Sequence, residues 1–300
     1  MAAQSPDISV QAAVLAAARP AEAPRAGATW KRLGLSFWLS AVWLALVSLS
    51  ALFFPLLHFP NPNLPDLANQ AAGPGPGHVL GTDTLGRDML SRLVAGARIS
   101  LTVGYASTLL GLMGGAILGL AAGYFRGRLE GFIVAAMDAV LAFPALVLVL
   151  AVTAFVGHDI RIIILILGAI GIPAFARVTR ANTLSLAQRE FVLAARAMGA
   201  GDLRILGLEI LPNVMPSILT FGLLVVAVAM IAEGTLAFLG LSVPPPAASW
   251  GAMVAEGRSS LDTSPQVSLI PAAVFFLTIF SLNLAADRLR RLVEVRESRI

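Results

Sequence analysis

The side chains that could perform chemistry are few in this sequence and widely spaced. A phosphate-binding P-loop needs the pattern G-x-x-x-x-G-K-[ST], and the only lysine, Lys31, lies outside any such pattern. The sequence has no cysteine, which excludes thiolate nucleophiles and Cys-ligated zinc or iron–sulfur sites. No H-E-x-x-H metal motif and no G-x-S-x-G nucleophile elbow occurs. We therefore expect no catalytic residue, no metal site and no bound cofactor in this chain.

The other titratable side chains show no arrangement suited to catalysis. The three histidines lie at unrelated spacings in segments predicted as loops, where solvated side chains are a simpler interpretation than a metal site: His58, His78 and His158. Asp138 and Glu233 fall inside apolar runs, where an ionisable group is costly and a functional role is the default hypothesis. Two interpretations of these acids remain open: proton coupling in a secondary transporter, or pairing with an arginine or a backbone N–H inside a helix bundle.

The composition is that of a membrane protein. The chain has 300 residues, of which 57% are apolar and only 13% charged, and its mean hydropathy is +0.83. A soluble domain carries about 25% charged residues. Apolar runs that can cross a hydrocarbon core cover residues 33–57, 100–125, 132–156, 162–176, 214–241 and 267–286, and the fourth is the shortest. The sequence therefore predicts an all-α membrane protein with six transmembrane helices, and its small, scattered net charge of +4 gives no sign of a nucleic-acid partner.

Polar segments set the predicted order of domains. Residues 1–29 form a disordered tail, 30–57 the first transmembrane helix, 58–97 an extracytoplasmic loop with a surface helix, 98–287 a five-helix core and 288–300 a basic tail. Within the core, residues 178–213 form a long loop, and Gly171 and Pro173 interrupt the span before it. With six spans, both termini lie on the same side of the membrane, and 16 of the 21 basic residues fall in segments on that side. This positive-inside bias predicts that both termini and the loop are cytoplasmic.

The second span carries four glycines at intervals of four residues: Gly111, Gly115, Gly119 and Gly123. They share one helical face and allow another backbone to approach closely. Packing inside the subunit and a contact with a second subunit or a pore both remain open for this face.

Residues 189–213, "REFVLAARAMGAGDLRILGLEILPN", are unusually charged for a connection between spans. In a helix over Arg189–Met198, Phe191, Ala194, Ala195 and Met198 are predicted to form one apolar face. A second helix, from Asp202 onward, is predicted to bear another apolar side, formed by Leu203, Leu206 and Ile210.

The turn between these helices and the end of the second one are also predicted. Gly199 suits the left-handed position that ends a helix, and Pro212 stops the second helix and starts the next span. Mixed charge, small residues and a sharp turn favour docking into a groove of a cytoplasmic partner over an amphipathic element that lies on lipid headgroups.

Several of these stretches resemble one family of transport proteins. Glu190, Ala194, Ala195, Gly199 and the terminal Ile-Leu-Pro resemble the "EAA" loop of bacterial ABC importer permeases. Three further stretches are similar to the dipeptide/oligopeptide/nickel branch and to its C-type subunit: "LGTDTLGRDMLSRLVAGARISL" from residue 80, "MDAVLAFPALVLVLAV" from residue 137 and "EGTLAFLGLSVPPPAASWGAMV" from residue 233.

The resemblance implies a type I ABC importer permease fold in the bacterial inner membrane. It also implies a second homologous permease subunit as a heterodimer partner, two ATP-binding subunits that hold ATP and magnesium, an external substrate-binding protein, and the lipid bilayer. ATP hydrolysis would then take place in separate subunits. Di- and oligopeptides are the substrates that fit best, with nickel chelates and glutathione-like solutes as alternatives. A proton-coupled secondary transporter that uses Asp138 or Glu233 is the competing function.

The same resemblance implies roles for individual residues. Coupling to the ATPase subunits falls to Glu190, Ala194, Ala195, Arg196, Gly199, Asp202, Leu203, Arg204, Leu206 and Pro212. Asp83, Arg87 and Asp88 would lie over the outer mouth, where they contact the binding protein, close a gate or cap a surface helix.

Overall fold

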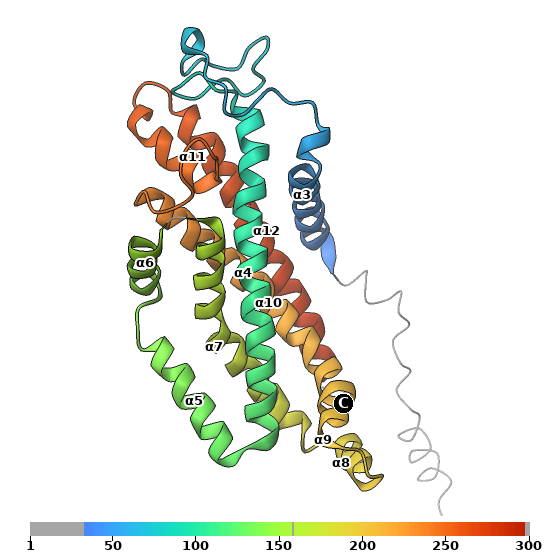
Figure 1. Cartoon of the computed structure of the whole chain (residues 1–300). Helices are drawn as coiled ribbons and strands as arrows, with labels where there is room; N and C mark the ends of the chain where they lie inside the picture. Colours follow the sequence, from blue (N-terminus) through green and yellow to red (C-terminus); the bar gives the residue numbers. More distant parts are fainter. Residues whose placement is uncertain (1–32, 158, 298–300) are drawn as a thin grey trace, which may run out of the picture. The chain divides into compact units, whose positions relative to one another are not determined.

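A computed structural model describes residues 33–157 and 159–297, and it is built almost entirely of helices (Figure 1). The predicted tail at residues 1–29 and His158 lie outside the described residues. The main helices are α3 (Gly34–Leu52), α4 (Met89–Phe125), α5 (Gly127–Leu141), α6 (Ala145–Val156), α7 (Ile160–Leu186), α8 (Glu190–Ala197), α9 (Asp202–Arg204), α10 (Leu211–Phe238), α11 (Trp250–Gly257) and α12 (Gln266–Glu297). Short 3₁₀ segments lie at Phe54–Leu56, Leu67–Asn69 and Arg258–Ser260. In this part of the chain no strand forms, and the isolated bridges pair Gly75 with His78 and Thr82 with Asp88.

The predicted all-α membrane fold is confirmed by the long apolar helices. Five helices of the described residues are long and apolar enough to cross a membrane, and the pair α5–α6 adds a sixth if it forms one span. The two helices of that pair meet at an angle of 76°. The predicted third span, residues 132–156, is therefore bent: Pro144 lacks an N–H and disfavours helical geometry at Phe143, so the helix breaks there.

α4 differs from its predicted start. It begins at Met89, and the residues predicted as a separate surface helix are its first turns. The Asp88 carboxylate accepts a hydrogen bond of 2.8 Å from the Ser91 N–H and so caps this end. The polar side chains of Ser91 and Arg92 are buried against other segments rather than lying on a membrane surface.

Two other helices run through positions predicted to interrupt or end them. α7 includes Pro173 and continues to Leu186, so neither Gly171 nor Pro173 breaks the fourth span. α12 continues to Glu297, so most of the predicted basic tail at residues 288–300 is helical. In both cases the helix continues past a weak local signal because its apolar part is already packed in the bundle.

The glycine face of α4 packs on α7 of the same chain. A Cβ atom at Gly115 would lie 2.8 Å from the Ala176 nitrogen, and one at Gly123 would lie 2.9 Å from the Arg180 oxygen. Real side chains do not fit at such distances, so the small residues allow the two backbones to touch. This contact holds α4 and α7 together as a rigid pair, and they lie side by side in Figure 1.

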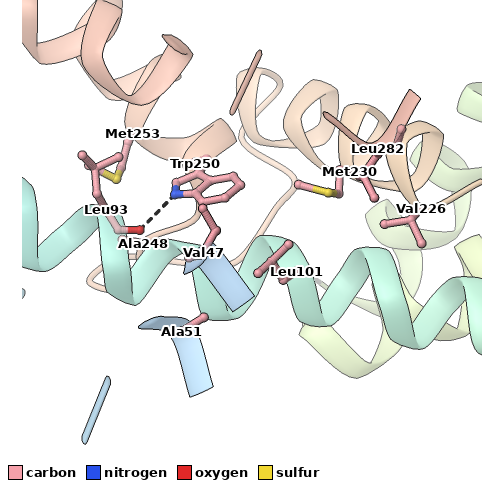
Figure 2. Packing of buried hydrophobic residues seen from close by; sticks show 12 residues of the cluster. Val47, Ala51, Leu93, Leu101, Val226, Met230, Ala248, Trp250, Met253 and Leu282 are labelled. Atoms are coloured by element: carbon pink, nitrogen blue, oxygen red, sulfur yellow. Dashed lines mark hydrogen bonds between the residues drawn. The ribbon is translucent and has the colours of Figure 1, made fainter. Parts of the chain in front are cut away.

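A second packing centre surrounds Trp250 of α11 (Figure 2). The indole N–H donates a hydrogen bond of 2.9 Å to the Leu93 carbonyl of α4, which satisfies the polar end of a fully buried ring. Val47 and Ala51 of α3 and Met230 of α10 belong to the same cluster. Leu282 of α12 also belongs to it, so the cluster ties five helices together.

Candidate functional site

The segment at residues 189–213 lies at the end of α4 opposite to Met89 (Figure 1). α8 follows the end of α7 after a short turn, and α9 leads through a π-helical stretch at Ile205–Ile210 directly into α10. The predicted loop at residues 178–213 is therefore shorter than expected, because α7 occupies its first residues. Both predicted helices exist, but the second continues into the next span.

The turn between the two helices has the predicted left-handed glycine. Gly199 has a φ of +83°, and its N–H donates to the Arg196 carbonyl at 3.0 Å. The Ala200 N–H donates to the Ala195 carbonyl at 3.0 Å. These two bonds form a Schellman motif, which satisfies free carbonyls at the end of α8 and fixes the direction in which the chain leaves it.

The residues of the predicted apolar face of α8 divide between buried and exposed positions. Val192 and Ala195 are buried and Phe191 is half-buried, whereas Ala194 is exposed and Met198 is 81% exposed. The i, i+3 spacing of Val192 and Ala195 matches a helix as well as the predicted set does, because almost every residue of this helix is apolar.

The second helix also buries a different set of residues. Ile205 and Ile210 are buried, Leu206 is half-buried, and Leu203 is 84% exposed. Pro212 does not stop this helix. Its ring would clash with the carbonyl of residue 208 in an ordinary α-helix, and the wider turns before it, where the Leu211 N–H donates to the Leu206 carbonyl, relieve the clash.

The exposed side chains of this region form an unusually apolar group, which we call the apolar rim. Its members are Leu193, Met198, Leu203 and Leu208, with exposed fractions of 51%, 81%, 84% and 64%. Beneath them, Val192, Ala195, Ile205 and Ile210 pack with residues of α4 and α10 in one buried cluster. The rim is therefore carried on a packed base, and an exposed apolar group is typical of a site that contacts another protein or a membrane.

A polar contact attaches the same region to α4. The Tyr124 hydroxyl donates to an Asp202 carboxylate oxygen at 2.7 Å and accepts from the Arg196 guanidinium at 3.0 Å. The Arg196 guanidinium carbon also lies 5.5 Å from the centre of the Tyr124 ring. The hydrogen bond to Tyr124 raises the pKa of the Arg196 guanidinium, and the nearby Asp202 carboxylate adds to this effect. All four charged residues Glu190, Arg196, Asp202 and Arg204 are exposed, and Arg196 and Asp202 also form hydrogen bonds to Tyr124.

At the other end of α4, charged side chains are buried rather than exposed. Arg87 binds Asp83 at 2.6 Å and Glu256 of α11 at 2.8 Å. Arg92 binds the same two carboxylates at 3.2 and 3.0 Å, and its side chain is 1% exposed. We call these four residues the outer ion cluster. Because Asp83 and Arg87 are buried in it, their direct role is to join the segment before α4 to α11.

Asp88, the third predicted outer residue, is the cap of α4. Burial alone would raise the pKa of the Asp88 carboxyl, but hydrogen bonds from the Ser91 hydroxyl and N–H and from His78 outweigh burial and lower it. The ionised carboxylate is therefore the form that holds the first turn of α4. The structural capping that the sequence left open is what Asp88 does here.

The two acids inside apolar runs have separate surroundings. Asp138 of α5 pairs with Arg177 of α7 at 2.6 Å, and both side chains are about half exposed. Glu233 of α10 is fully buried and accepts a hydrogen bond of 2.6 Å from the Ser242 hydroxyl. The structure does not bring these two acids together.

Three residues that matter to these sites were not predicted from the sequence: Tyr124, Arg92 and Glu256. Tyr124 lies 72 and 78 residues from its partners Arg196 and Asp202. Glu256 lies 169 residues from Arg87. A single sequence contains no local signal for contacts at such separations, although an aromatic residue beside the glycine face was visible.

Comparison with known proteins agrees with this architecture. Residues 115–299 match the family model described as "Binding-protein-dependent transport system inner membrane component". The chain is 42% identical to the glutathione transport system permease protein GsiD of Pectobacterium atrosepticum, over 73% of this chain and 72% of that protein. It is 38% identical to a Brucella suis protein provisionally named a peptide transport system permease protein, over 87% and 88% of the two chains.

A solved structure shares the fold. The structure of the MetNI methionine ABC transporter in an inward-facing conformation aligns with a TM-score of 0.56 and 19% identity, over 68% of this chain and 97% of that one. The helices, the family match and the relatives lead to one conclusion: this chain is a multi-pass membrane protein that belongs to the family of binding-protein-dependent transport system inner membrane components, the permeases of ABC importers.

Proposed function

We propose that the chain is one permease subunit of an ATP-driven importer of di- and oligopeptides. Two relatives are named for glutathione, which is itself a tripeptide, and for peptides, and this supports short peptides as the substrate class. In the complete importer this chain pairs with a second homologous permease, two ATP-binding subunits and an external binding protein. ATP and magnesium are held by the ATP-binding subunits. The positive-inside bias supports cytoplasmic termini and a cytoplasmic position for α8 and α9.

The observation that carries the proposal is the apolar rim on its packed base. A cytoplasmic surface that exposes Met198 and Leu203 almost completely gains stability when a partner covers it. The Schellman turn at Gly199 holds α8 at a fixed angle to α9. A partner groove that accepts two short helices at this angle would bind them in helix-in-groove fashion.

Coupling then follows from the rigid connections of the site. When the ATPase pair closes on ATP, the docked α8 and α9 move with it. Because the buried cluster under the rim includes Ala116 of α4 and Val214 and Ile218 of α10, the displacement passes to these helices as a rigid-body motion. The pathway between the two permease subunits then changes between inward-open and outward-open states.

The proposal is tested by placing a charge in the rim. Leu203→Glu is expected to weaken co-purification with the cognate ATP-binding subunits by about tenfold or more, because a charged group would be buried in an apolar contact. Leu261→Glu is the matched control, since Leu261 is 45% exposed and lies next to α11, at the other end of the molecule. Equal co-purification of the two variants would contradict docking through the rim.

The substrate class has its own test. Proteoliposomes that contain the complete importer and its binding protein are given labelled dipeptide, labelled glutathione or a nickel chelate. ATP-dependent uptake of a peptide substrate is expected. Uptake of the nickel chelate alone would overturn the substrate assignment without affecting the coupling assignment. Uptake that follows an imposed proton gradient without ATP would instead favour the secondary transporter.

A further inference from the structure

Tyr124 occupies an unusual position among the residues around the rim. It is the penultimate residue of α4, and its hydroxyl both donates and accepts a hydrogen bond with side chains of residues 189–213, which we call the coupling segment. Arg196 belongs to α8 and Asp202 to α9, so one phenol contacts both helices on either side of the Gly199 turn. No other hydrogen bond recorded between side chains joins α4 to α8 or α9 in the part of the chain that the structure describes.

The hydrogen bonds of the Tyr124 hydroxyl fix the orientation of its two partners. The hydroxyl can donate only one proton, and it donates to Asp202 at 2.7 Å while Arg196 donates to it at 3.0 Å. The position of Arg196 over the ring, 5.5 Å from its centre, adds a cation–π interaction. A phenylalanine at this position would keep the ring contact and lose both hydrogen bonds, so the two contributions can be separated by experiment.

The opposite side of this helix end is fixed just as firmly. Gly123, the preceding residue, packs directly against α7, where a Cβ atom would lie 2.7 Å from the Thr183 Cβ. The phenol is therefore attached to a point of α4 that cannot shift independently of α7. A displacement of α8 and α9 that is held by Tyr124 must move α4 and α7 together.

We propose that Tyr124 is the positioning residue that fixes α8 and α9 against the end of α4, so that displacement of the docked helices is passed to the α4–α7 pair. The proposal rests on the proposed function, because it presumes that α8 and α9 dock on the ATPase subunits. It concerns the efficiency of transmission rather than docking itself: Tyr124 belongs to α4 and is half-buried, whereas the rim side chains belong to the docking segment and are exposed.

The test compares Tyr124→Phe with Tyr105→Phe in the complete reconstituted importer. These are the two tyrosines of the chain, both lie on α4, and Tyr105 contacts only the Ser48 hydroxyl at 3.4 Å among the recorded side-chain hydrogen bonds. Substrate uptake per ATP hydrolysed is expected to fall about fivefold or more in Tyr124→Phe, because both hydrogen bonds are lost and one typical bond alone corresponds to about that factor. It is expected to stay unchanged in Tyr105→Phe. Assembly with the ATPase subunits is expected to be normal in both variants.

A second readout reports position directly. The chain has no cysteine, so spin labels at Leu129→Cys and Ala197→Cys, both exposed positions, are the only labels it carries. The distance distribution between α5 and α8 is expected to broaden in Tyr124→Phe and to remain narrow in Tyr105→Phe. If Tyr124→Phe does not assemble, Asp202→Asn, which weakens one of the two bonds and adds no bulk, is measured in its place and is expected to show a smaller change in the same direction.

The outcomes separate the two proposals. Unchanged uptake per ATP together with an unchanged distance distribution in Tyr124→Phe would overturn the role of Tyr124, even if docking is intact. Failure of the unmodified chain to bind the ATPase subunits would overturn the proposed function itself. A fall in uptake per ATP that is equal in both tyrosine variants would also reject the role of Tyr124, because it would reflect a general effect on α4.

Discussion

The two ends of α4 use charge in opposite ways. At the Met89 end, Asp83, Arg87 and Arg92 are buried, Arg87 and Arg92 pair with the partly buried Glu256, and one network joins the preceding segment to α11. At the Phe125 end, large apolar side chains such as Met198 and Leu203 are exposed, while the charged Glu190 and Arg204 are also exposed. One end therefore pairs its charged groups within the chain, and the other leaves apolar area uncovered.

This difference indicates which end of α4 makes its stabilising contacts within the chain. A buried ion network is costly to assemble, but it fixes a geometry strongly once its members are paired. An exposed apolar rim on a packed base leaves stabilising contacts to be made by another protein. The end at Met89 is thus built as a rigid cap, and the end at Phe125 carries the exposed apolar rim on which the proposed docking rests.

The largest effect on stability is expected from a substitution in the outer ion cluster. Arg92→Met keeps much of the side-chain volume, but it removes one of the two arginines that pair with the Asp83 and Glu256 carboxylates. The free energy of unfolding is expected to fall by about 3–5 kcal/mol. Denaturant titration of the detergent-solubilised protein measures this change. Arg98→Met, at an exposed position on the same helix, is the control and is expected to have little effect. Equal stability of the two variants would show that the outer ion cluster does not hold the cap.

The next effect concerns the docking end. Gly199→Val places a β-branched residue at a φ of +83°, where an ordinary residue loses about 1–2 kcal/mol. We expect the variant to insert normally and to hydrolyse ATP in the complex, with uptake largely uncoupled from hydrolysis. Gly201→Val is the matched control, because Gly201 has a φ of −72° and open space around it. Normal uptake by Gly199→Val would contradict a role for the turn angle.

A smaller effect is expected from Asp88, the residue that caps the N-terminus of α4. Asp88→Ala should lower stability by about 1 kcal/mol, and Asp88→Asn by less, because asparagine also caps helices. The pKa of Asp88 is lowered in the folded protein, so its contribution is present above the unfolded value of about 3.9 and is lost as the pH falls through the folded pKa. The stability difference between the parent chain and Asp88→Ala should therefore stay constant from pH 7 to pH 5 and shrink only below about pH 4. A difference that already disappears between pH 7 and pH 5 would refute this assignment.

The smallest effect is expected from Asp138→Asn. The pair of Asp138 with Arg177 is about half exposed on both sides, and such pairs contribute only about 0–1 kcal/mol. ATP-dependent uptake is expected to be close to normal at all proton gradients. Loss of uptake, with assembly intact, would revive the proton-coupled function for this acid. Arg177→Gln removes the same pair from the other side and should behave in the same way.

Much of the fold could be predicted because the long apolar runs determine where most of the helices form. The runs near residues 33–57, 214–241 and 267–286 correspond to α3, α10 and α12. The exceptions have local causes. The start of α4 was missed because its first turns are polar, and their burial depends on Glu256, which lies far away in sequence. Pro173 was predicted to interrupt a helix, but packing in the bundle outweighs its local cost.

The coupling segment was predicted in outline but not in detail. The Gly199 turn follows from one residue type, and it is present. Which residues of α8 are buried within the chain could not be predicted, because a helix with apolar residues on most sides offers two faces with helical spacing. Only the position of α4 and α10 selects Val192 and Ala195. The hydrogen bond from Arg196 to Tyr124 likewise depends on tertiary structure and could not be predicted from the sequence.

The most direct test of the central claim uses a single photoreactive cysteine label in the rim. Leu203→Cys carries the only thiol of the chain, and Leu261→Cys carries it at the other end of the molecule. In membranes that contain the complete importer, illumination of the label at residue 203 is expected to join this chain to an ATP-binding subunit, and the label at residue 261 is not. Adducts with the ATP-binding subunit from residue 261 but not from residue 203 would contradict docking through the rim.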